Sequence, residues 1–262
     1  MAYENIILAV DEGVATITLN RPDQLNPLDW STVKELRACL AALEDDRTVR
    51  VIVITGKGAA FSAGGDLKGY LRLYKRPEEF RQFLRDLYDL CDRLERSAKV
   101  VIAAVNGYCL AGGIELMLAC DLVVASEEAR IGDAHLNFGQ LPGGGGSQRL
   151  PRAIGVLRAK QFFFTGEWVG GREAERIGLV NQVVPADQLP AAVDELARKI
   201  LAKSPAGLKG MKYLVNEGMQ VNLHAGLELE LSYVHNYATA CPDAWEGLIA
   251  FSEKRKPKFE GA

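Results

Sequence analysis

"KVVIAAVNGYCLAGGIELMLACDLVVAS", residues 99–126, contains the pattern that decides the fold. Its first part, KVVIAAVNG, is an almost continuous apolar run ending in a turn signal, which is typical of a strand covered on both faces. The glycine-bearing turn LAGGIEL leads into a predicted helix, and DLVVAS then repeats the strand pattern. A strand, a turn, a helix and a second strand in succession indicate an α/β protein.

The same alternation extends in both directions from this stretch. NIILAV and VATITLN flank the turn-forming DEG and predict a hairpin at the start of the chain. Apolar positions at helical spacing predict amphipathic helices over residues 30–45 and 78–95, and VRVIVITG between them predicts a buried strand. LVNQVV predicts a further strand. Since the alternation continues to about residue 185, we expect a sheet that is at least partly parallel.

The sequence after residue 185 has a different character. Residues 187–251 have the pattern of successive helices, with Pro185, Pro205 and Pro242 near their predicted starts. We therefore expect an α/β body over residues 1–185 and a helical C-terminal region over residues 186–262, with no Gly/Ser linker between them.

Composition favours a cytoplasmic globular protein. The net charge of -3 gives no reason to expect a nucleic-acid partner, and the one dense basic run, EKRKPKF, is typical of a solvated tail. The five cysteines include no C-x-x-C pair, which argues against a disulfide framework or zinc site and favours a reducing compartment. No segment has the pattern of a secretory signal or the roughly 18 apolar residues of a membrane span.

Three turns rich in glycine are candidates for chemistry: FSAGGDL (61–67), LAGGIEL (110–116) and LPGGGGSQ (141–148). None has the spacing of a P-loop or a dinucleotide-binding turn. The first two each follow a predicted strand and precede a predicted helix, where free backbone N–H groups point outward. Two such turns placed together could stabilise charge on one carbonyl oxygen, although glycine is also ordinary in strand-to-helix turns.

The glycine-rich turns and the sequence around them resemble those of a known protein family. FSAGGDL, NGYCLAGGIELMLACDLVVASEEARIG and LPGGGGSQRLPRAIG, in this order and with these separations, resemble the crotonase family, the enoyl-CoA hydratase/isomerase group. The likeness continues through TGEWVGGREAERIGLVNQVVP to DAWEGLIAFSEKRKPKF, so it covers nearly the whole chain. The resemblance implies a spiral of repeated ββα units followed by a C-terminal helical region for trimer assembly, with a homotrimer or homohexamer as the assembled form.

The resemblance also implies an acyl-CoA thioester substrate and no metal or redox cofactor. Its carbonyl oxygen would be held by the backbone N–H groups of Gly65 and Gly112. The positions that match the coenzyme A contacts of the family are Gln24, Leu25, Ala63 and Asp66, with Lys254 and Lys258 as further candidates whose alternative is solvated surface charge. The four glycines at 143–146 match a close-packed family turn beside the acyl pocket and are not interpreted as a phosphate cradle.

Glu115 and His135 are the predicted acid-base residues. A helix that begins near Gly112 holds Glu115 about one turn away, and by resemblance it matches one of two hydratase glutamates. His135, in DAHLNFG, stands where those enzymes have the second glutamate. Imidazole titrates near neutral pH and can still move protons. Asp133 is predicted either to orient His135 or replace the missing carboxylate, or alternatively to cap a turn.

The leading prediction is an enzyme that stabilises a thioester enolate, with hydration or dehydration of an enoyl-CoA as the reaction. The alternative, motivated by His135, is another reaction of the family: double-bond isomerisation, decarboxylation or C–C hydrolysis of a β-keto acyl-CoA. Gly143 stands where dienoyl-CoA isomerases have aspartate, which weakens that subtype. A non-catalytic acyl-CoA or RNA-binding role is the third hypothesis. Tyr70, Tyr74 and Phe138 are predicted to be packing residues, with the acyl pocket wall as their alternative.

Overall fold

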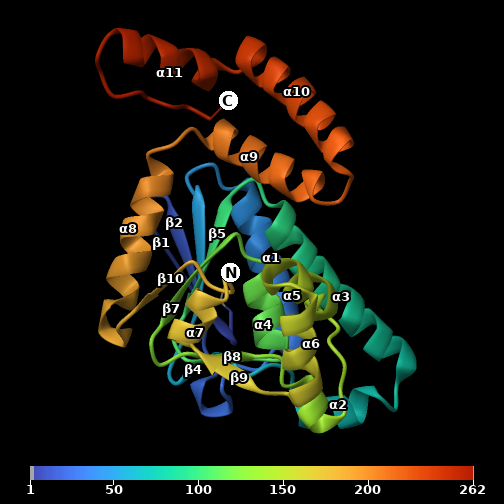
Figure 1. Ribbon diagram of the computed structural model, residues 1–262. Helices are drawn as coiled ribbons and strands as arrows, with labels where there is room; N and C mark the ends of the chain where they lie inside the picture. Colours follow the sequence, from blue (N-terminus) through green and yellow to red (C-terminus); the bar gives the residue numbers. More distant parts are fainter. Residues whose placement is uncertain (1–2, 262) are drawn as a thin grey trace.

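The computed structural model describes residues 3–261 as an α/β body that carries a helical arm (Figure 1). The body contains a six-stranded sheet in the order β1-β2-β3-β5-β7-β10. Its strands are β1 (Ile6–Asp11), β2 (Val14–Leu19), β3 (Val51–Gly56), β5 (Val100–Val105), β7 (Leu122–Ser126) and β10 (Gln182–Val184). β1 and β2 form the predicted antiparallel hairpin, and the pairs from β2 to β10 are parallel, as the alternation predicted.

A second, four-stranded sheet lies below the first in the order β4-β6-β8-β9. It consists of β4 (Ala60–Ser62), β6 (Tyr108–Leu110), β8 (Arg130–Gly132) and β9 (Trp168–Gly170). β3, β5 and β7 each continue after a short turn into β4, β6 and β8 respectively. Each unit therefore contributes one long and one short strand before its helix, which is the repeated ββα spiral that the resemblance implied.

The helical elements are α1 (Trp30–Asp45), α2 (Leu67–Leu73), α3 (Pro77–Arg96), α4 (Gly112–Leu118), α5 (Gly146–Ile154), α6 (Val156–Thr165), α7 (Gly171–Arg176), α8 (Leu189–Leu201), α9 (Pro205–Gly218), α10 (Leu223–Ala240) and α11 (Pro242–Ser252), with 3-10 turns η1 (Pro22–Gln24), η2 (His135–Phe138) and η3 (Ala186–Gln188). Local sequence explains several starts. Asp29 caps α1 by accepting from Thr32 N at 2.9 Å, and Ser204 caps α9 in the same way.

Both faces of the large sheet are covered. On one face, Ile52 and Ile54 belong to the main hydrophobic core with the apolar sides of α1 and α3. On the other face, Val51 and Val53 pack in a second cluster with Val193 and other residues of α8. Burial of a strand on both faces explains the continuous apolar run of β5, all of whose residues are buried. α8 lies within the region expected to be helical from residue 186, yet it packs on the sheet as part of the body.

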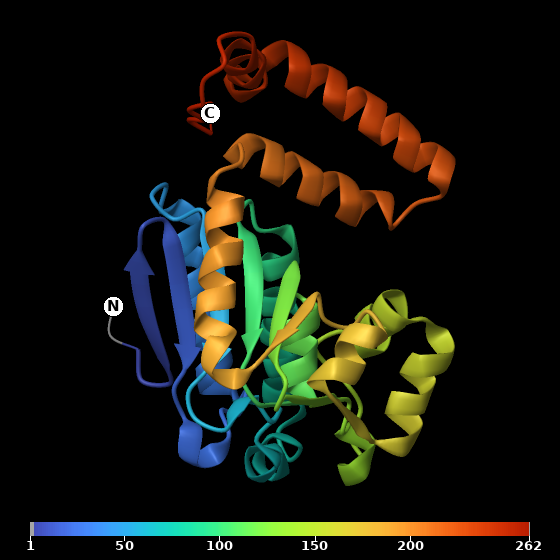
Figure 2. The same ribbon diagram turned by 60° about the vertical axis from the view of Figure 1, so that its left-hand side comes forward.

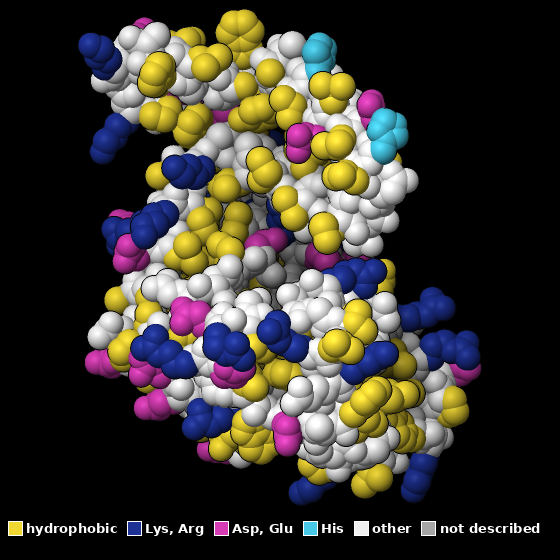
Figure 3. Space-filling model, in the orientation of Figure 1, with side chains coloured by type: hydrophobic (Ala, Val, Ile, Leu, Met, Phe, Trp, Pro, Cys, Tyr) yellow, Lys and Arg dark blue, Asp and Glu magenta, His cyan; other side chains and the backbone are white. Residues whose placement is uncertain are grey.

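The last helices, α9 to α11, extend away from the body as an arm (Figure 2). α9 contacts the body, whereas none of the residues described in α10 is buried. Hydrophobic side chains gather on the surface of this arm, and a hollow lies beside its junction with the body (Figure 3). Among residues 3–261, no helix combines the length and apolar character that a bilayer crossing requires.

Candidate active site

The ends of three adjacent strands bring the predicted site residues together. β4, β6 and β8 are neighbours in the small sheet and run parallel, so the turns that follow them meet at one edge. These turns carry Gly65, Gly112 and the segment from Asp133 to His135, respectively. The predicted convergence of the first two glycine turns is thus a direct result of the spiral.

The glycines in these turns allow close backbone packing. A side chain at Gly113 would place its Cβ 2.2 Å from Ser62 O, so α4 docks directly on the end of β4. A Cβ at Gly64 would lie 3.0 Å from Gly112 N, which places the two turns in contact. Ala111 precedes α4 with φ 48° and ψ -117°, a strained conformation for a residue with a side chain. The chain therefore turns sharply into α4.

The two turns also leave N–H groups available. Gly112 is the first residue of α4, so its N–H has no partner within the helix. Within residues 3–261, the Gly65 N–H has no protein hydrogen-bond acceptor either. Gly65, Gly112 and Glu115 line the same small cavity, whose free volume is about 30 Å³. The two N–H donors and the Glu115 carboxylate therefore face the same cavity.

Glu115 is held in this cavity by the four-glycine turn. Its side chain is 1% exposed, and its Oε1 accepts from Gly144 N at 2.7 Å and from Gly146 N at 2.8 Å. Burial raises the pKa of Glu115, against the opposing effects of these hydrogen bonds and of the charge on His135. The turn is close-packed beside the pocket, and its backbone holds a carboxylate of the protein itself.

His135 faces Glu115 from the opposite wall. Its Nδ1 lies 2.9 Å from Asp133 Oδ2, and its Nε2 lies 3.7 Å from Glu115 Oε2. Burial disfavours the charged imidazolium, but the hydrogen bond and charge of Asp133, together with the charge of Glu115, outweigh it and raise the pKa of His135. Asp133 Oδ1 also accepts from His135 N at 3.3 Å, so Asp133 orients the ring and binds the backbone where η2 begins, although the N-cap position itself is Ala134.

Aromatic and aliphatic side chains close the remaining wall. Tyr70 and Tyr74 line the cavity, together with Leu28, Phe80, Leu84, Leu87, Gln140, Leu141 and Gly143. The prediction that both tyrosines serve only as packing is therefore incomplete. Phe138 lies outside the cavity lining and is 61% exposed, so it is neither a core residue nor a wall of this cavity.

The residues predicted for the nucleotide end divide into two groups. Ala63 N donates to Leu25 O at 2.9 Å, which joins the loop after η1 to the first glycine turn. Gln24 ends η1 directly before Leu25, and Asp66 caps α2 by accepting from Lys68 N at 3.1 Å. Lys254 and Lys258 follow α11 instead, at the opposite end of the molecule from α2 (Figure 1). A single chain does not bring these two lysines to the site.

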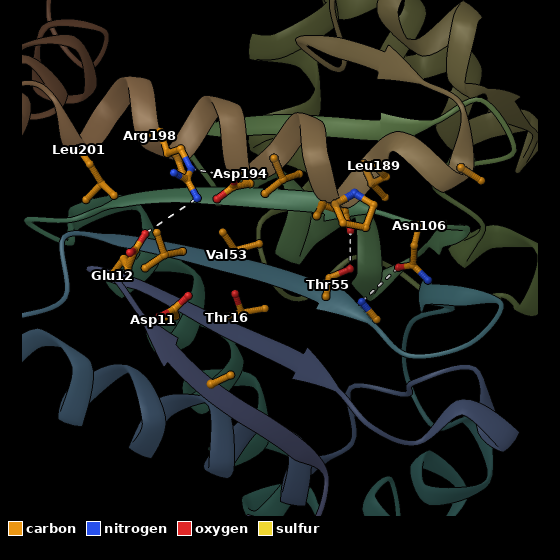
Figure 4. A pocket seen from close by; sticks show the side chains of 18 residues that line it. Asp11, Glu12, Thr16, Val53, Thr55, Asn106, Leu189, Asp194, Arg198 and Leu201 are labelled. Carbon is orange, nitrogen blue, oxygen red and sulfur yellow. Dashed lines mark hydrogen bonds and ion pairs between the residues drawn. The ribbon is translucent and has the colours of Figure 1, made fainter.

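A roomier cavity, of about 440 Å³, lies between α8 and the large sheet (Figure 4). Two of its polar side chains are bound to the backbone: Thr55 Oγ1 donates to a backbone carbonyl at 2.9 Å, and Asn106 Oδ1 accepts from a backbone N–H at 3.1 Å. At its other end, Arg198 pairs with Asp194 and Glu12, which are all exposed. No buried acid-base pair lines it, so the smaller cavity is the candidate active site.

No group of three or more His, Cys, Asp or Glu side chains within residues 3–261 has an arrangement suited to a metal ion.

The profile of the family described as enoyl-CoA hydratase/isomerase matches residues 9–262. The chain belongs to the enoyl-CoA hydratase/isomerase family.

Relatives in this family match the chain over almost its full length. It is 39% identical over 261 residues to a protein named crotonyl-CoA hydratase from Syntrophomonas wolfei, covering 99% of both chains. It is 38% identical to a short-chain-enoyl-CoA hydratase from Clostridium acetobutylicum, covering 98% of this chain and 97% of that protein. The crystal structure of an enoyl-CoA hydratase from Bacillus anthracis superimposes with a TM-score of 0.93 at 38% identity, covering 99% and 100% of the two chains. The fold prediction is confirmed.

Proposed function

We propose that this member of the enoyl-CoA hydratase/isomerase family hydrates an enoyl-CoA reversibly. The observation that carries the proposal is the pair formed by Glu115 Oε2 and His135 Nε2, 3.7 Å apart in a cavity that also presents the Gly65 and Gly112 N–H groups. A carboxylate and an imidazole at this separation can share one water molecule. The full-length similarity to proteins named hydratases supports the same reaction.

In the proposed mechanism, the Gly65 and Gly112 N–H groups hold the thioester oxygen. Glu115 takes a proton from the water as its oxygen adds to the β-carbon, and the negative charge passes to the thioester oxygen as an enolate. The imidazolium of His135 protonates the α-carbon. The proton held by Glu115 then returns to His135 across the short separation between them, which restores both residues.

The environments of the two groups suit these assignments. Asp133 accepts from Nδ1 of His135, which leaves Nε2 directed at the reaction space and favours its protonated form. Glu115 has one oxygen occupied by Gly144 and Gly146, so the other oxygen is free to take the water proton. The histidine position thereby supplies the acid that a second glutamate would supply in other hydratases.

For the nucleotide end of coenzyme A, we propose the surface around Gln24, Leu25, Ala63 and Asp66, because the Ala63 to Leu25 hydrogen bond places these segments side by side. Coenzyme A takes part as a portion of the substrate, and the proposal requires no separate cofactor. Lys254 and Lys258 can reach this surface only from a neighbouring subunit.

We propose a homotrimer or a pair of trimers as the assembled form. α10 carries a stripe of exposed apolar side chains at helical spacing: Leu223, Leu227, Leu231 and Val234. A second copy is the occupant that would also supply the missing lysines. Light scattering coupled to size exclusion tests this: a Leu227→Asp, Leu231→Asp double variant should be monomeric, and an unchanged mass would contradict the assignment. The five cysteines include no C-x-x-C pair, which favours a reducing compartment, and we propose the cytoplasm.

The decisive experiment is incubation with crotonyl-CoA and with a cyclic enoyl-CoA in deuterated water, followed by enoyl absorbance and mass. Hydration predicts loss of absorbance and one deuterium on the α-carbon of the product. Exchange into saturated or β-keto acyl-CoAs without water addition would instead favour isomerisation, decarboxylation or C–C hydrolysis, which the imidazole at position 135 also permits. Binding without exchange of α-protons would indicate a non-catalytic acyl-CoA protein.

A further inference from the structure

The phenol of Tyr70 lies against Gly65 in the candidate active site. A Cβ built on Gly65 would lie 2.2 Å from Tyr70 Oη and 2.6 Å from its Cζ, so the hydroxyl end of the ring rests on the Gly65 backbone. Gly65 is one of the two residues that would hold the thioester oxygen. An acyl chain that leaves this oxygen therefore meets the Tyr70 ring within its first carbons.

Other aromatic rings support Tyr70 from behind. The ring of Tyr74 stacks on it with centroids 5.9 Å apart, and the ring of Phe83 lies 5.7 Å away in a tilted arrangement. Phe80 meets Tyr70 edge-on at 6.3 Å. Tyr74 is itself hydrogen-bonded to Gln140, which also lines the cavity. Since neighbouring rings resist displacement in a close-packed cluster, the Tyr70 ring has little freedom to move away from the cavity.

The free space beside the reacting groups is correspondingly small. Its volume of about 30 Å³ has room for roughly two water molecules. Apart from the acid-base pair, the polar side chains that line it are those of Tyr70, Tyr74 and Gln140, and the other lining side chains are apolar. An acyl group must be small and apolar to enter without displacing this cluster.

We propose that Tyr70 is the residue that limits the size of the acyl group that this site admits. This inference rests on the proposed function, since it assigns a specificity-determining residue to the same site. The bulk of the ring carries the effect, and the hydroxyl does not: a phenylalanine would leave the same obstacle, whereas a small side chain would open a channel toward Leu84.

The test compares crotonyl-CoA with trans-2-octenoyl-CoA for wild type, Tyr70→Ala and Tyr70→Phe. The measured quantity is the ratio of kcat/KM for the longer substrate to that for the shorter one, which is independent of the fraction of active enzyme. Tyr70→Ala should raise this ratio about tenfold or more, because a few methylene groups in an apolar pocket are worth that much discrimination. Tyr70→Phe should leave the ratio within about twofold of wild type.

Phe138→Ala is the matched control, because Phe138 is an aromatic residue of the same region that lies outside the cavity. Its ratio should equal that of wild type. Tyr70→Leu serves as a second opening variant in case loss of the whole ring collapses the cluster, and circular dichroism checks that each variant is folded. An unchanged ratio in a folded Tyr70→Ala or Tyr70→Leu variant would overturn the proposal.

Calorimetric binding of butyryl-CoA and octanoyl-CoA separates this inference from the proposed reaction, because saturated thioesters need no chemistry. Tyr70→Ala should strengthen octanoyl-CoA binding relative to butyryl-CoA about tenfold. If the protein hydrates no enoyl-CoA but this shift is observed, the assignment of Tyr70 stands and the proposed reaction is wrong. If hydration is observed without either shift, the reaction stands and Tyr70 does not limit acyl size.

Discussion

Glu115 and His135 face each other across one cavity, but the protein holds them by different means. Glu115 lies on α4, is 1% exposed, and is bound by two backbone N–H groups. The His135 side chain is 12% exposed, lies on the short turn η2, and depends on the side chain of Asp133 for its orientation. Backbone groups of the fold hold Glu115, whereas a side chain holds His135. A side chain can be substituted without a change of fold. The His135 side of the site can therefore vary its chemistry independently.

The largest effect on activity should follow from replacement of Glu115, whose carboxylate is held by backbone N–H groups. Glu115→Gln should lower kcat for crotonyl-CoA hydration by about 10³-fold, since it removes the group that accepts the water proton. Calorimetric affinity for a saturated acyl-CoA should remain close to that of wild type. Glu78→Gln is the matched control, because Glu78 is 82% exposed and makes only a long ion pair with Arg81. Retention of full activity by Glu115→Gln would remove it from the mechanism.

A smaller loss of activity is expected when His135 is replaced. His135→Gln should lower kcat by about 10²-fold and leave the folded structure intact, because only side-chain contacts are removed. His135→Glu, which restores the residue found at this position in hydratases, should recover part of the loss. Steady-state kinetics and thermal unfolding measured together test this. A large drop in Tm would mean that the fold depends on His135 after all.

The difference between α4, which carries Glu115, and η2, which carries His135, can also be measured as a difference in the free energy of unfolding. Gly113→Ala should cost about 3 kcal/mol of unfolding free energy, because its Cβ would lie 2.2 Å from the Ser62 backbone and the helix would have to move. Gly139 ends η2 with φ 65° and has open space around its Cα. Gly139→Ala should cost only about 1 kcal/mol, from its backbone conformation. Urea unfolding decides between them, and equal losses would contradict the comparison.

The smallest effect concerns pH. Asp133 supplies a hydrogen bond and a negative charge that raise the pKa of His135, while burial opposes them. The alkaline limb of kcat against pH, where the imidazolium loses its proton, should therefore lie above the usual 6.5. Asp133→Asn removes the negative charge, weakens the hydrogen bond to a neutral one and keeps the burial, so this limb should move to lower pH, with about a tenfold loss of kcat at pH 8. A limb that stays in place would show that His135 is not the acid.

Much of the body could be predicted from sequence because its periodicities are strong. The double burial of β5 produces a continuous apolar run, and the single buried face of α1 produces the helical spacing over residues 30–45. The resemblance placed Gly65 and Gly112 at one site, and the fold explains this because each follows the short strand of its own ββα unit. Asp133 and His135 are two residues apart, so their contact lies within the reach of local reasoning.

The rest depended on contacts between distant segments. The bonds from Gly144 and Gly146 to Glu115 span 29 and 31 residues, so their pairing becomes visible only in the folded chain. Tyr70 has the same helical pattern as a core residue, but α2 forms the wall of a cavity and has no buried residue. α8 has the amphipathic pattern of the later helices, yet only its position shows that its apolar face covers the sheet.

The fixed carboxylate of Glu115 has a stereochemical consequence. With Oε1 bound by two backbone N–H groups, the side chain cannot rotate to exchange its oxygens, and Oε2 meets the substrate from one direction only. For a planar enoyl group held by its thioester oxygen, water then arrives at a single face of the β-carbon. The product should be one enantiomer of the β-hydroxyacyl thioester, and its handedness is determined by a turn of four glycines that have no chirality of their own.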